Sequence, residues 1–261
     1  MKLSVVIPAW NEVASIGAAV ESARSFADEV IVADAGSPDG TAERAAAAGA
    51  IVVIAPKGRG HQLRVGAARA SGDVLLFLHA DVTLTSGARP AIERALLDAA
   101  TVGGNFRLRF EPASFAARVF TAANDVRRRL FRIYYGDSAI FVRAATYTTL
   151  GGFHALPILE DYDFVRRLER AGPTVYVRDV VAIASARRFL HAPVRTLFAW
   201  TALQVLFSLG VSAERLVRFY ADARPRPEPA RRNIGAGVAG AEMPGAAEEP
   251  ATTETDRAII R

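Results

Sequence analysis

Apolar runs of strand length alternate with segments of helical spacing through the first 80 residues of the 261-residue chain. The expected strands are LSVVI (3–7), EVIVADAGS (29–37), IVVIA (51–55) and DVLLFLHA (73–80). The expected helices are SIGAAVESARSF (15–26), TAERAAAAG (41–49) and GRGHQLRVGAARASG (58–72). Uninterrupted apolar strands alternating with helices are typical of a mostly parallel sheet covered on both faces. We therefore predict an α/β fold with ligands at the carboxyl ends of the strands.

The second half of the chain has a less regular pattern. We expect strands at 103–110 and 139–147, with a basic helix at 114–132 between them. A further helix is expected at 160–172, with acids in its first turn and Gly172 as its stop, and one or two amphipathic helices at 194–220. Residues 222–261 hold five prolines and no aromatic residue, which indicates a disordered tail. We therefore expect one domain over 1–221.

Composition excludes several classes of chemistry. Without cysteine there is no disulfide, thiolate zinc site or cysteine nucleophile, which is compatible with a reducing cytoplasm, the compartment that we expect. The formal charge is +5, and the segment from Asp222 onward has six basic and seven acidic residues, so the positive excess belongs to the body. Such an excess suits a nucleotide, a phosphosugar or an acidic membrane surface. We expect no nucleic-acid partner, because no recognition motif is present.

Membrane contact is a weaker expectation. The longest apolar stretch, residues 197–211, is shorter than the roughly 20 residues that a spanning helix needs, and the N-terminal apolar run is broken too early to be a signal peptide. Aromatic and arginine residues at near-helical spacing in 194–220 suggest peripheral contact with the inner face of a membrane, although core packing is the favoured use.

Polar residues follow the first two expected strands. We expect Pro8 to end the first strand, because it has no N–H to continue a ladder. Asn11 and Glu12 then lie at the mouth of the sheet, or cap the next helix. Asp34 follows the second strand, where its carboxylate can accept hydrogen bonds from a base or from ribose hydroxyls, or form an ordinary Asx turn.

The segment PKGRGHQL contains a cationic, glycine-rich loop before a helix. Lys57 and Arg59 beside Gly58 and Gly60 suit phosphate oxygens. No Gly-Lys-Ser/Thr follows at Walker spacing, which disfavours ATP hydrolysis.

Two acidic sites complete the candidate chemistry. In LLFLHADVTL, Asp81 suits a divalent cation that bridges two phosphates. His79 is open between a metal ligand, a ribose contact and a structural hydrogen bond. In ILEDYDF, Glu160 and Asp161 begin a helix whose dipole favours their ionised forms, so they can act as a general base toward a hydroxyl or serve only as helix-start acids.

Seven blocks in order resemble the family 2 glycosyltransferases: VVIPAWNE, VADAGSPDGT, KGRGHQL, ASGDVLLFLHAD, YYGDSAIFVR, LGGFHALPILED and SARRF. The resemblance covers about residues 1–220. It is closest to a bacterial subgroup described as arsenosugar-biosynthesis-type glycosyltransferases. It implies a GT-A fold, which is a Rossmann-like sheet with flanking helices, divided into a nucleotide-binding half (about 1–100) and an acceptor half with the C-terminal helices (about 101–221).

The resemblance also implies roles for individual residues. The nucleotide-binding set would be Pro8, Ala9, Asn11, Glu12, Asp34, Gly36, Lys57, Gly58, Arg59, Gln62, His79 and Ala80. Asp81 would hold Mg²⁺ or Mn²⁺, and Asp161 would deprotonate the acceptor hydroxyl with support from Glu160. Gly136 and Asp137 would line the acceptor pocket, and Arg187 and Arg188 would meet the diphosphate.

The implied reaction is transfer of a sugar from a nucleoside-diphosphate sugar to a hydroxyl acceptor by direct displacement with inversion. Retention and nucleotidyl transfer are alternatives. A further alternative is an inactive nucleotide-binding regulator, because His79 replaces the first Asp of the wider family's metal motif. His61, Arg64 and Ser138 depart from the subgroup's pattern and leave the donor and the acceptor open.

Overall fold

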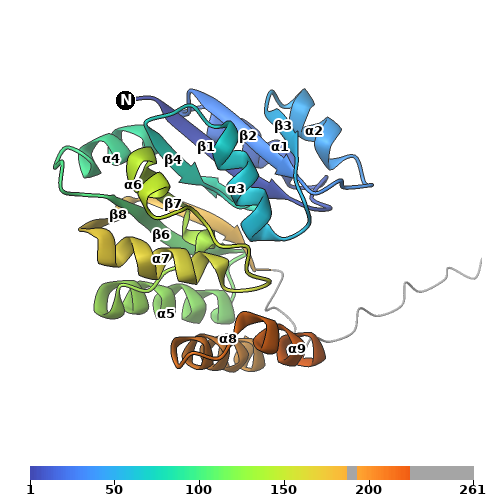
Figure 1. The fold of residues 1–261 in the computed structure, drawn as a ribbon, viewed down its shortest axis with the longest axis vertical. Coiled ribbons are helices and arrows are strands. Elements are labelled where there is room, and N and C mark those ends of the chain that lie inside the picture. Colours follow the sequence, from blue (N-terminus) through green and yellow to red (C-terminus); the bar gives the residue numbers. More distant parts are fainter. Residues whose placement is uncertain (187–192, 224–261) are drawn as a thin grey trace, which may run out of the picture. The chain divides into compact units, whose positions relative to one another are not determined.

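A mixed eight-stranded β-sheet runs through the computed structural model, which describes residues 1–186 and 193–223 (Figure 1). The strands are β1 (Leu3–Ala9), β2 (Glu29–Asp34), β3 (Ile51–Ile54), β4 (Val74–Phe77), β5 (Val82–Leu84), β6 (Gly103–Glu111), β7 (Ile140–Arg143) and β8 (Thr174–Ser185). Their order in the sheet is β3-β2-β1-β4-β7-β6-β8-β5. The sheet is parallel from β3 to β4, and β7 and β5 are antiparallel to their neighbours. The predicted α/β fold is confirmed, with the parallel part confined to the first half and to the β6–β8 pair.

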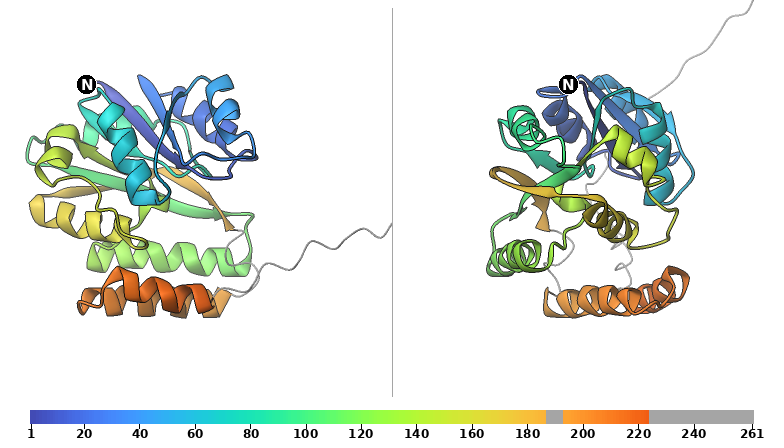
Figure 2. Two further views of the ribbon diagram at one scale, coloured as in Figure 1. Left: turned by 45° about the vertical axis from the view of Figure 1, so that its right-hand side comes forward. Right: turned by 60° about the vertical axis from the view of Figure 1, so that its left-hand side comes forward.

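Helices cover both faces of this sheet (Figures 1 and 2). They are α1 (Ile16–Arg24), α2 (Thr41–Ala47), α3 (Arg59–Arg69), α4 (Ala88–Ala95), α5 (Phe115–Phe131), α6 (Ala144–Thr149), α7 (Glu160–Ala171), α8 (Pro193–Ser208) and α9 (Ala213–Ala223), with a 3₁₀ turn η1 (Gly136–Ser138). The alternation of side chains along β1 explains the two layers. Val5 and Ile7 join a core cluster with α1, α4 and α5, whereas Val6 joins a second cluster with α3 and α7.

Three sequence expectations need correction. Pro8 does not end the first strand, because β1 pairs with β4 only from Leu3 to Val6, so no partner there requires an N–H from residue 8. The strand expected at 139–147 stops at Arg143, and α6 follows at once. The long strand β8, which pairs with β6 and β5, was not expected at all.

The two C-terminal helices differ in character. In α9, Ala213 and Leu216 are buried while Arg215 and Arg218 are exposed, so this helix is amphipathic as expected. In α8, Leu203 is buried but apolar residues such as Phe198 are exposed, so its apolar side chains surround the helix. No helix within the described residues is long and apolar enough to cross a membrane. The segment predicted to be disordered lies outside the described residues, except for its first two positions at the end of α9.

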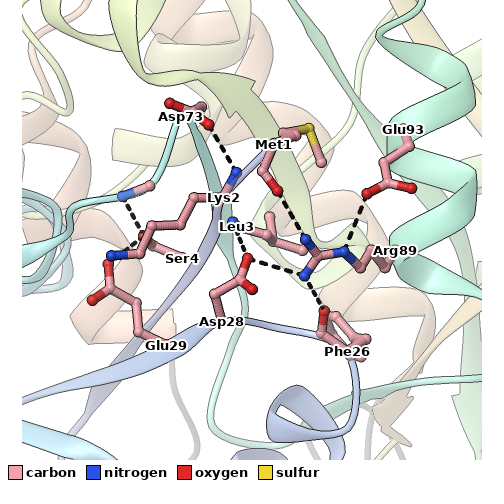
Figure 3. A network of polar contacts seen from close by, with 11 residues as sticks. Met1, Lys2, Leu3, Ser4, Phe26, Asp28, Glu29, Asp73, Arg89 and Glu93 are labelled. Carbon is pink, nitrogen blue, oxygen red and sulfur yellow. Dashed lines mark hydrogen bonds and ion pairs between the residues drawn. The ribbon is translucent and has the colours of Figure 1, made fainter.

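A polar network fixes the amino ends of the central strands (Figure 3). Arg89 of α4 donates to the Asp28 carboxylate at 3.0 Å and to the Met1 carbonyl at 2.8 Å. Glu29 accepts hydrogen bonds from Ser4 Oγ at 2.5 Å and from the Ser71 N–H at 2.7 Å. The edge opposite the candidate site is therefore held by side chains that bond to the backbone.

The Glu29 contacts predict a loss of stability in acid. Burial raises the pKa of Glu29, but hydrogen bonds from Ser4 and Ser71 outweigh this effect and leave the pKa below its ordinary value of 4.5. Because the folded-state pKa is lowered, the stabilisation is present above pH 4.5 and is lost as the pH falls through the folded-state value. In urea titrations, the free energy of unfolding should decrease from pH 6 toward about pH 3, and Glu29→Gln should flatten that decrease.

The matched control is Glu21→Gln, which removes an exposed carboxylate of α1. It should keep the pH dependence of the wild type. If the free energy of unfolding had the same pH dependence in the wild type and in Glu29→Gln, Glu29 would not be the group responsible for the loss of stability in acid.

Candidate active site

The loop after β2 is organised by Asp34. This buried carboxylate accepts hydrogen bonds from the Gly36 N–H at 2.8 Å, the Ser37 N–H at 2.7 Å and the Ser37 hydroxyl at 2.6 Å. Gly36 has a left-handed backbone (φ +76°), and the space above its Cα is open. The Asp34 carboxylate thus holds the turn as in an Asx turn. Gly36 lies on the open side of this loop.

The ends of β1 and β2 are joined by Gln62. Its side-chain amide donates to the carbonyl oxygens of Ala9 at 2.6 Å and Ala33 at 3.1 Å, and the residue is buried. Gln62 is therefore a positioning residue that fixes the spacing of the two strand ends from the first turns of α3.

The loop after β1 carries an exposed aromatic residue that the sequence analysis missed. Trp10 lies beneath Lys57, whose Nζ is 3.6 Å from the ring centroid, an arrangement typical of a cation–π contact. Asn11 and Glu12 are tied to the next loop, because the Asn11 N–H donates to Ser37 Oγ at 3.0 Å and the Glu12 N–H donates to Thr41 Oγ1 at 2.8 Å. The signal for Trp10 in the sequence is an indole placed directly after a buried strand end.

The glycines of the GRG segment serve different purposes. Gly58 has φ +119°, a backbone conformation that L side chains rarely adopt. Gly60, inside the first turn of α3, approaches the loop before α7 so closely that a Cβ would overlap the carbonyl oxygen of His154. The two glycines let the cationic loop turn and let α3 pack against the segment that leads into Glu160.

Arg59 connects the two halves of the site. Its Nε bonds to the Glu160 carboxylate, and its guanidinium lies 3.7 Å from Asp161 Oδ2. Burial opposes the charge on Arg59, but Glu160 and Asp161 raise its pKa above the ordinary value. Burial raises the pKa of Glu160, and the charge of Arg59 opposes this rise. The two acids at the start of α7 therefore share one arginine from the GRG loop.

Asp161 and His79 meet at Gly136. The Gly136 N–H donates to Asp161 Oδ2 at 2.9 Å, and the Tyr162 N–H donates to Asp161 Oδ1 at 2.8 Å. A Cβ on Gly136 would overlap His79 Nε2 and lie 3.4 Å from Asp161 Oδ2. The half-buried imidazole of His79 thus packs on the backbone that positions the Asp161 carboxylate.

Strained backbone is concentrated around these residues. Of the four non-glycine residues with positive φ among the described residues, Leu159 (φ 61°) directly precedes Glu160, Ala139 (φ 53°) directly follows η1, and Asn11 (φ 56°) follows β1. Such conformations persist only where the surrounding structure enforces them, and they are often found at functional sites.

A small hollow lies beside η1. Its polar lining includes Asn105, Asn124, Arg128, Tyr135, Asp137 and Ser138. Arg128 is buried and donates to Asn105 Oδ1 at 2.6 Å and Thr174 Oγ1 at 2.9 Å. The hollow thus has hydrogen-bonding groups next to the loop that positions Asp161.

A divalent ion would have few protein ligands here. Asp81 and His79 follow β4, and both are half-buried, while Ala80 between them is buried. No group of three or more His, Asp or Glu side chains within the described residues could hold an ion. This donor set fits an ion that takes most of its ligands from a diphosphate and water, as Mg²⁺ commonly does.

The predicted residues at the carboxyl ends of β1, β2 and β4 thus share one edge of the sheet with Gly136, Asp137, Glu160 and Asp161. Arg187 and Arg188 lie outside the described residues. The roles assigned to single residues stay predictions.

Comparisons with known proteins agree with this geometry. The family model for glycosyl transferase family 2 matches residues 4–148. Glucosyl-3-phosphoglycerate synthase of Mycolicibacterium smegmatis is 39% identical over 93 residues, which cover 31% of this chain and 31% of that protein. The aligned part is thus about a third of the length of this curated relative.

Solved structures share the fold. One is glucosyl-3-phosphoglycerate synthase from Mycobacterium tuberculosis in complex with Mn²⁺, UDP-glucose and phosphoglyceric acid (TM-score 0.53, 24% identity, covering 80% of each chain). Another is S. aureus TarS (TM-score 0.57, 16% identity, covering 85% of this chain and 43% of that chain). These likenesses confirm the GT-A fold expected from the sequence. They do not bear on the narrower arsenosugar-type resemblance. Because the family model matches more than half of the chain, including the loops after β1, β2 and β4, the chain belongs to glycosyl transferase family 2.

Proposed function

We propose that the protein transfers a sugar from a nucleoside-diphosphate sugar to an acceptor hydroxyl. The observation that carries this proposal is the position of Asp161. Its carboxylate is held by the Gly136 N–H at 2.9 Å, at the same edge of the sheet as the cationic loop of Lys57 and Arg59. A base for a hydroxyl and a region suited to phosphates thus lie together, as transfer to a hydroxyl requires.

The proposed chemistry is a single displacement. Asp161 accepts the proton of the acceptor hydroxyl as its oxygen attacks the anomeric carbon. The bond from that carbon to the diphosphate breaks, and the electron pair leaves with the diphosphate. Arg59 lies near the developing charge and stabilises it. Attack opposite the leaving group inverts the anomeric centre, and the stereochemistry of the product, read by NMR, tests inversion against retention.

Glu160 has a supporting role in this scheme. Its carboxylate accepts a hydrogen bond from Arg59 Nε and is almost fully buried. It therefore orients the guanidinium and offsets part of the positive charge that Arg59 places beside Asp161. Asp81 and His79 would hold Mg²⁺ or Mn²⁺, which would neutralise charge on the diphosphate. At the other end of the nucleotide, the Asp34 turn and Trp10 would receive the ribose and the base.

UDP-glucose is the first donor to test, and 3-phosphoglycerate is the first acceptor, because the relatives are glucosyl-3-phosphoglycerate synthases and one of them was solved with UDP-glucose and phosphoglyceric acid. The arsenosugar-type subgroup, a location in the cytoplasm and membrane contact through residues 194–220 stay predictions. The proposed place for the acceptor is beside η1, where Asp137 and Ser138 lie next to the Asp161 loop; the hollow there is about 10 Å³ and has to widen to admit it.

A donor and acceptor screen tests the proposal. Nucleotide release should be measured for the common nucleoside-diphosphate sugars, each with and without a panel of hydroxyl acceptors. We expect release that depends on the acceptor with at least one donor, that is lost in excess EDTA, and that returns with Mn²⁺ or Mg²⁺. Tight binding of UDP by calorimetry without any transfer would instead support the nucleotide-binding regulator and contradict the enzyme.

A further inference from the structure

The outer face of α5 is apolar, which is the reverse of an ordinary surface helix. Phe115, Val119, Ala122, Val126 and Leu130 are exposed and recur at intervals of three or four residues, so they form one stripe along the helix, called the α5 stripe below. Phe115 is 82% exposed and Leu130 is 70% exposed.

The inner face of α5 is already used by the fold. Ala117 and Phe120 belong to the core cluster, and Phe120 packs on Phe110 and Trp200. Arg128 is buried among hydrogen-bond partners. The residues of the α5 stripe are therefore not needed to pack α5 against the core. A contiguous group of exposed apolar side chains on one helix is typical of an interaction site.

Arginines border the α5 stripe. Arg118, Arg129 and Arg132 are exposed on the same helix or at its C-cap. The acid of this helix, Asp125, is paired with Arg129 at 2.8 Å and accepts a hydrogen bond from Tyr176. Arg132 is paired with Glu169 of α7. The five arginines of α5 and its C-cap still outnumber these two acids, so the local charge is positive. An apolar stripe bordered by arginines is the pattern of a helix that lies in the interface of an anionic bilayer.

A second copy of the chain fits this surface less well. Antiparallel pairing of two stripes, about a twofold axis that runs across the helices, would bring Arg118 of one copy toward Arg129 and Arg132 of the other. Such like-charge contacts disfavour the pair. An anionic surface gains from the same arginines.

We propose that the α5 stripe binds the surface of a membrane that contains anionic lipids. The proposal does not depend on the transferase activity. It differs from the sequence expectation for residues 194–220, because it assigns the contact to a helix in the middle of the chain. Because α5 ends at the segment that leads into η1, bound protein would hold the Gly136 loop close to the lipid surface.

Vesicle sedimentation of the full chain tests the proposal. We expect binding to phosphatidylcholine vesicles with about a third phosphatidylglycerol, weaker binding in 0.5 M NaCl, and none to phosphatidylcholine alone. The variant Phe115→Gln/Leu130→Gln should lower the partition coefficient about tenfold or more, because it removes two large apolar side chains from the contact. Arg118→Gln should lower it several-fold.

Matched controls distinguish binding through the α5 stripe from nonspecific binding through other exposed apolar or basic residues. Leu97→Gln removes an 82% exposed leucine after α4, and Arg69→Gln removes an exposed arginine of α3. Both should bind vesicles as the wild type does. Circular dichroism and the melting temperature check that each variant folds.

Three results would overturn the proposal: no binding to anionic vesicles, an equal loss of binding in Leu97→Gln, or binding unaffected by Phe115→Gln/Leu130→Gln. Analytical ultracentrifugation supplies a further outcome. A dimer that Leu130→Gln dissociates, without vesicle binding by the wild type, would assign the α5 stripe to a second copy.

Discussion

Asp161→Asn should lower the rate of sugar transfer by about 10²- to 10⁴-fold, the usual contribution of a general base. The amide keeps the shape of the carboxylate, and its one oxygen can accept from the Gly136 N–H, which is at 2.9 Å in the wild type, but then not from the Tyr162 N–H. The loops after β1 and β2 are not touched by this change, so binding of the nucleotide should change little. Turnover and UDP affinity, measured by nucleotide release and calorimetry, separate a lost base from a lost site.

The control for Asp161→Asn is Asp163→Asn, two residues further along α7. Asp163 pairs with Arg167 at 2.7 Å and with His154 at 2.9 Å, so its loss affects the helix but not the Gly136 contact. This variant should melt earlier yet keep most of its turnover. Comparable activity of Asp161→Asn and the wild type would remove Asp161 as the base.

Gly136→Ala should abolish most activity and destabilise the protein by about 1–3 kcal/mol, the usual cost of overpacking. The added methyl group would overlap His79 Nε2 and lie 3.4 Å from Asp161 Oδ2. Either the imidazole or the loop that positions Asp161 has to move. Thermal unfolding and turnover of the variant measure the two effects.

A double-mutant cycle identifies the cause of that loss. Combining Gly136→Ala with His79→Ala removes the overlap. The free energy of unfolding of the double variant should therefore be close to that of His79→Ala alone. Gly17→Ala is the control, because its Cβ would meet only the mobile end of Arg44, with Nε at 2.8 Å. If the losses in free energy of unfolding of the two single variants were additive in the double variant, His79 and residue 136 would not be energetically coupled.

The fold could be predicted as far as its pattern is local. β1 to β4 are short apolar runs between helices, and the structure has all four. β8 escaped prediction because its pattern follows no simple alternation: Val177 and Val180 are buried, whereas Arg178 and Asp179 between them are exposed. Its pairing with β6 is also irregular between Phe106 and Arg107.

The residue types of the candidate site were predictable, but their partners were not. Asp34, Asp81 and Asp161 stand out because each follows a strand or begins a helix. Arg59 was expected beside the nucleotide, a role that stays a prediction, but its contact with Glu160, 101 residues away, could not be foreseen. The overlap of His79 with Gly136 likewise depends on how β4 and η1 approach in space. Local spacing carries no information on such contacts.

β5 has a consequence for any attempt to exchange parts between relatives. This strand belongs to the first hundred residues, yet it lies at the far edge of the sheet and pairs with β8 through Val82–Ala184 and Leu84–Ala182. A chimaera joined near residue 100 would thus combine β5 of one parent with β8 of another. The crossover would cut through a pair of hydrogen-bonded strands, so the segments before and after residue 100 are not independent folding modules.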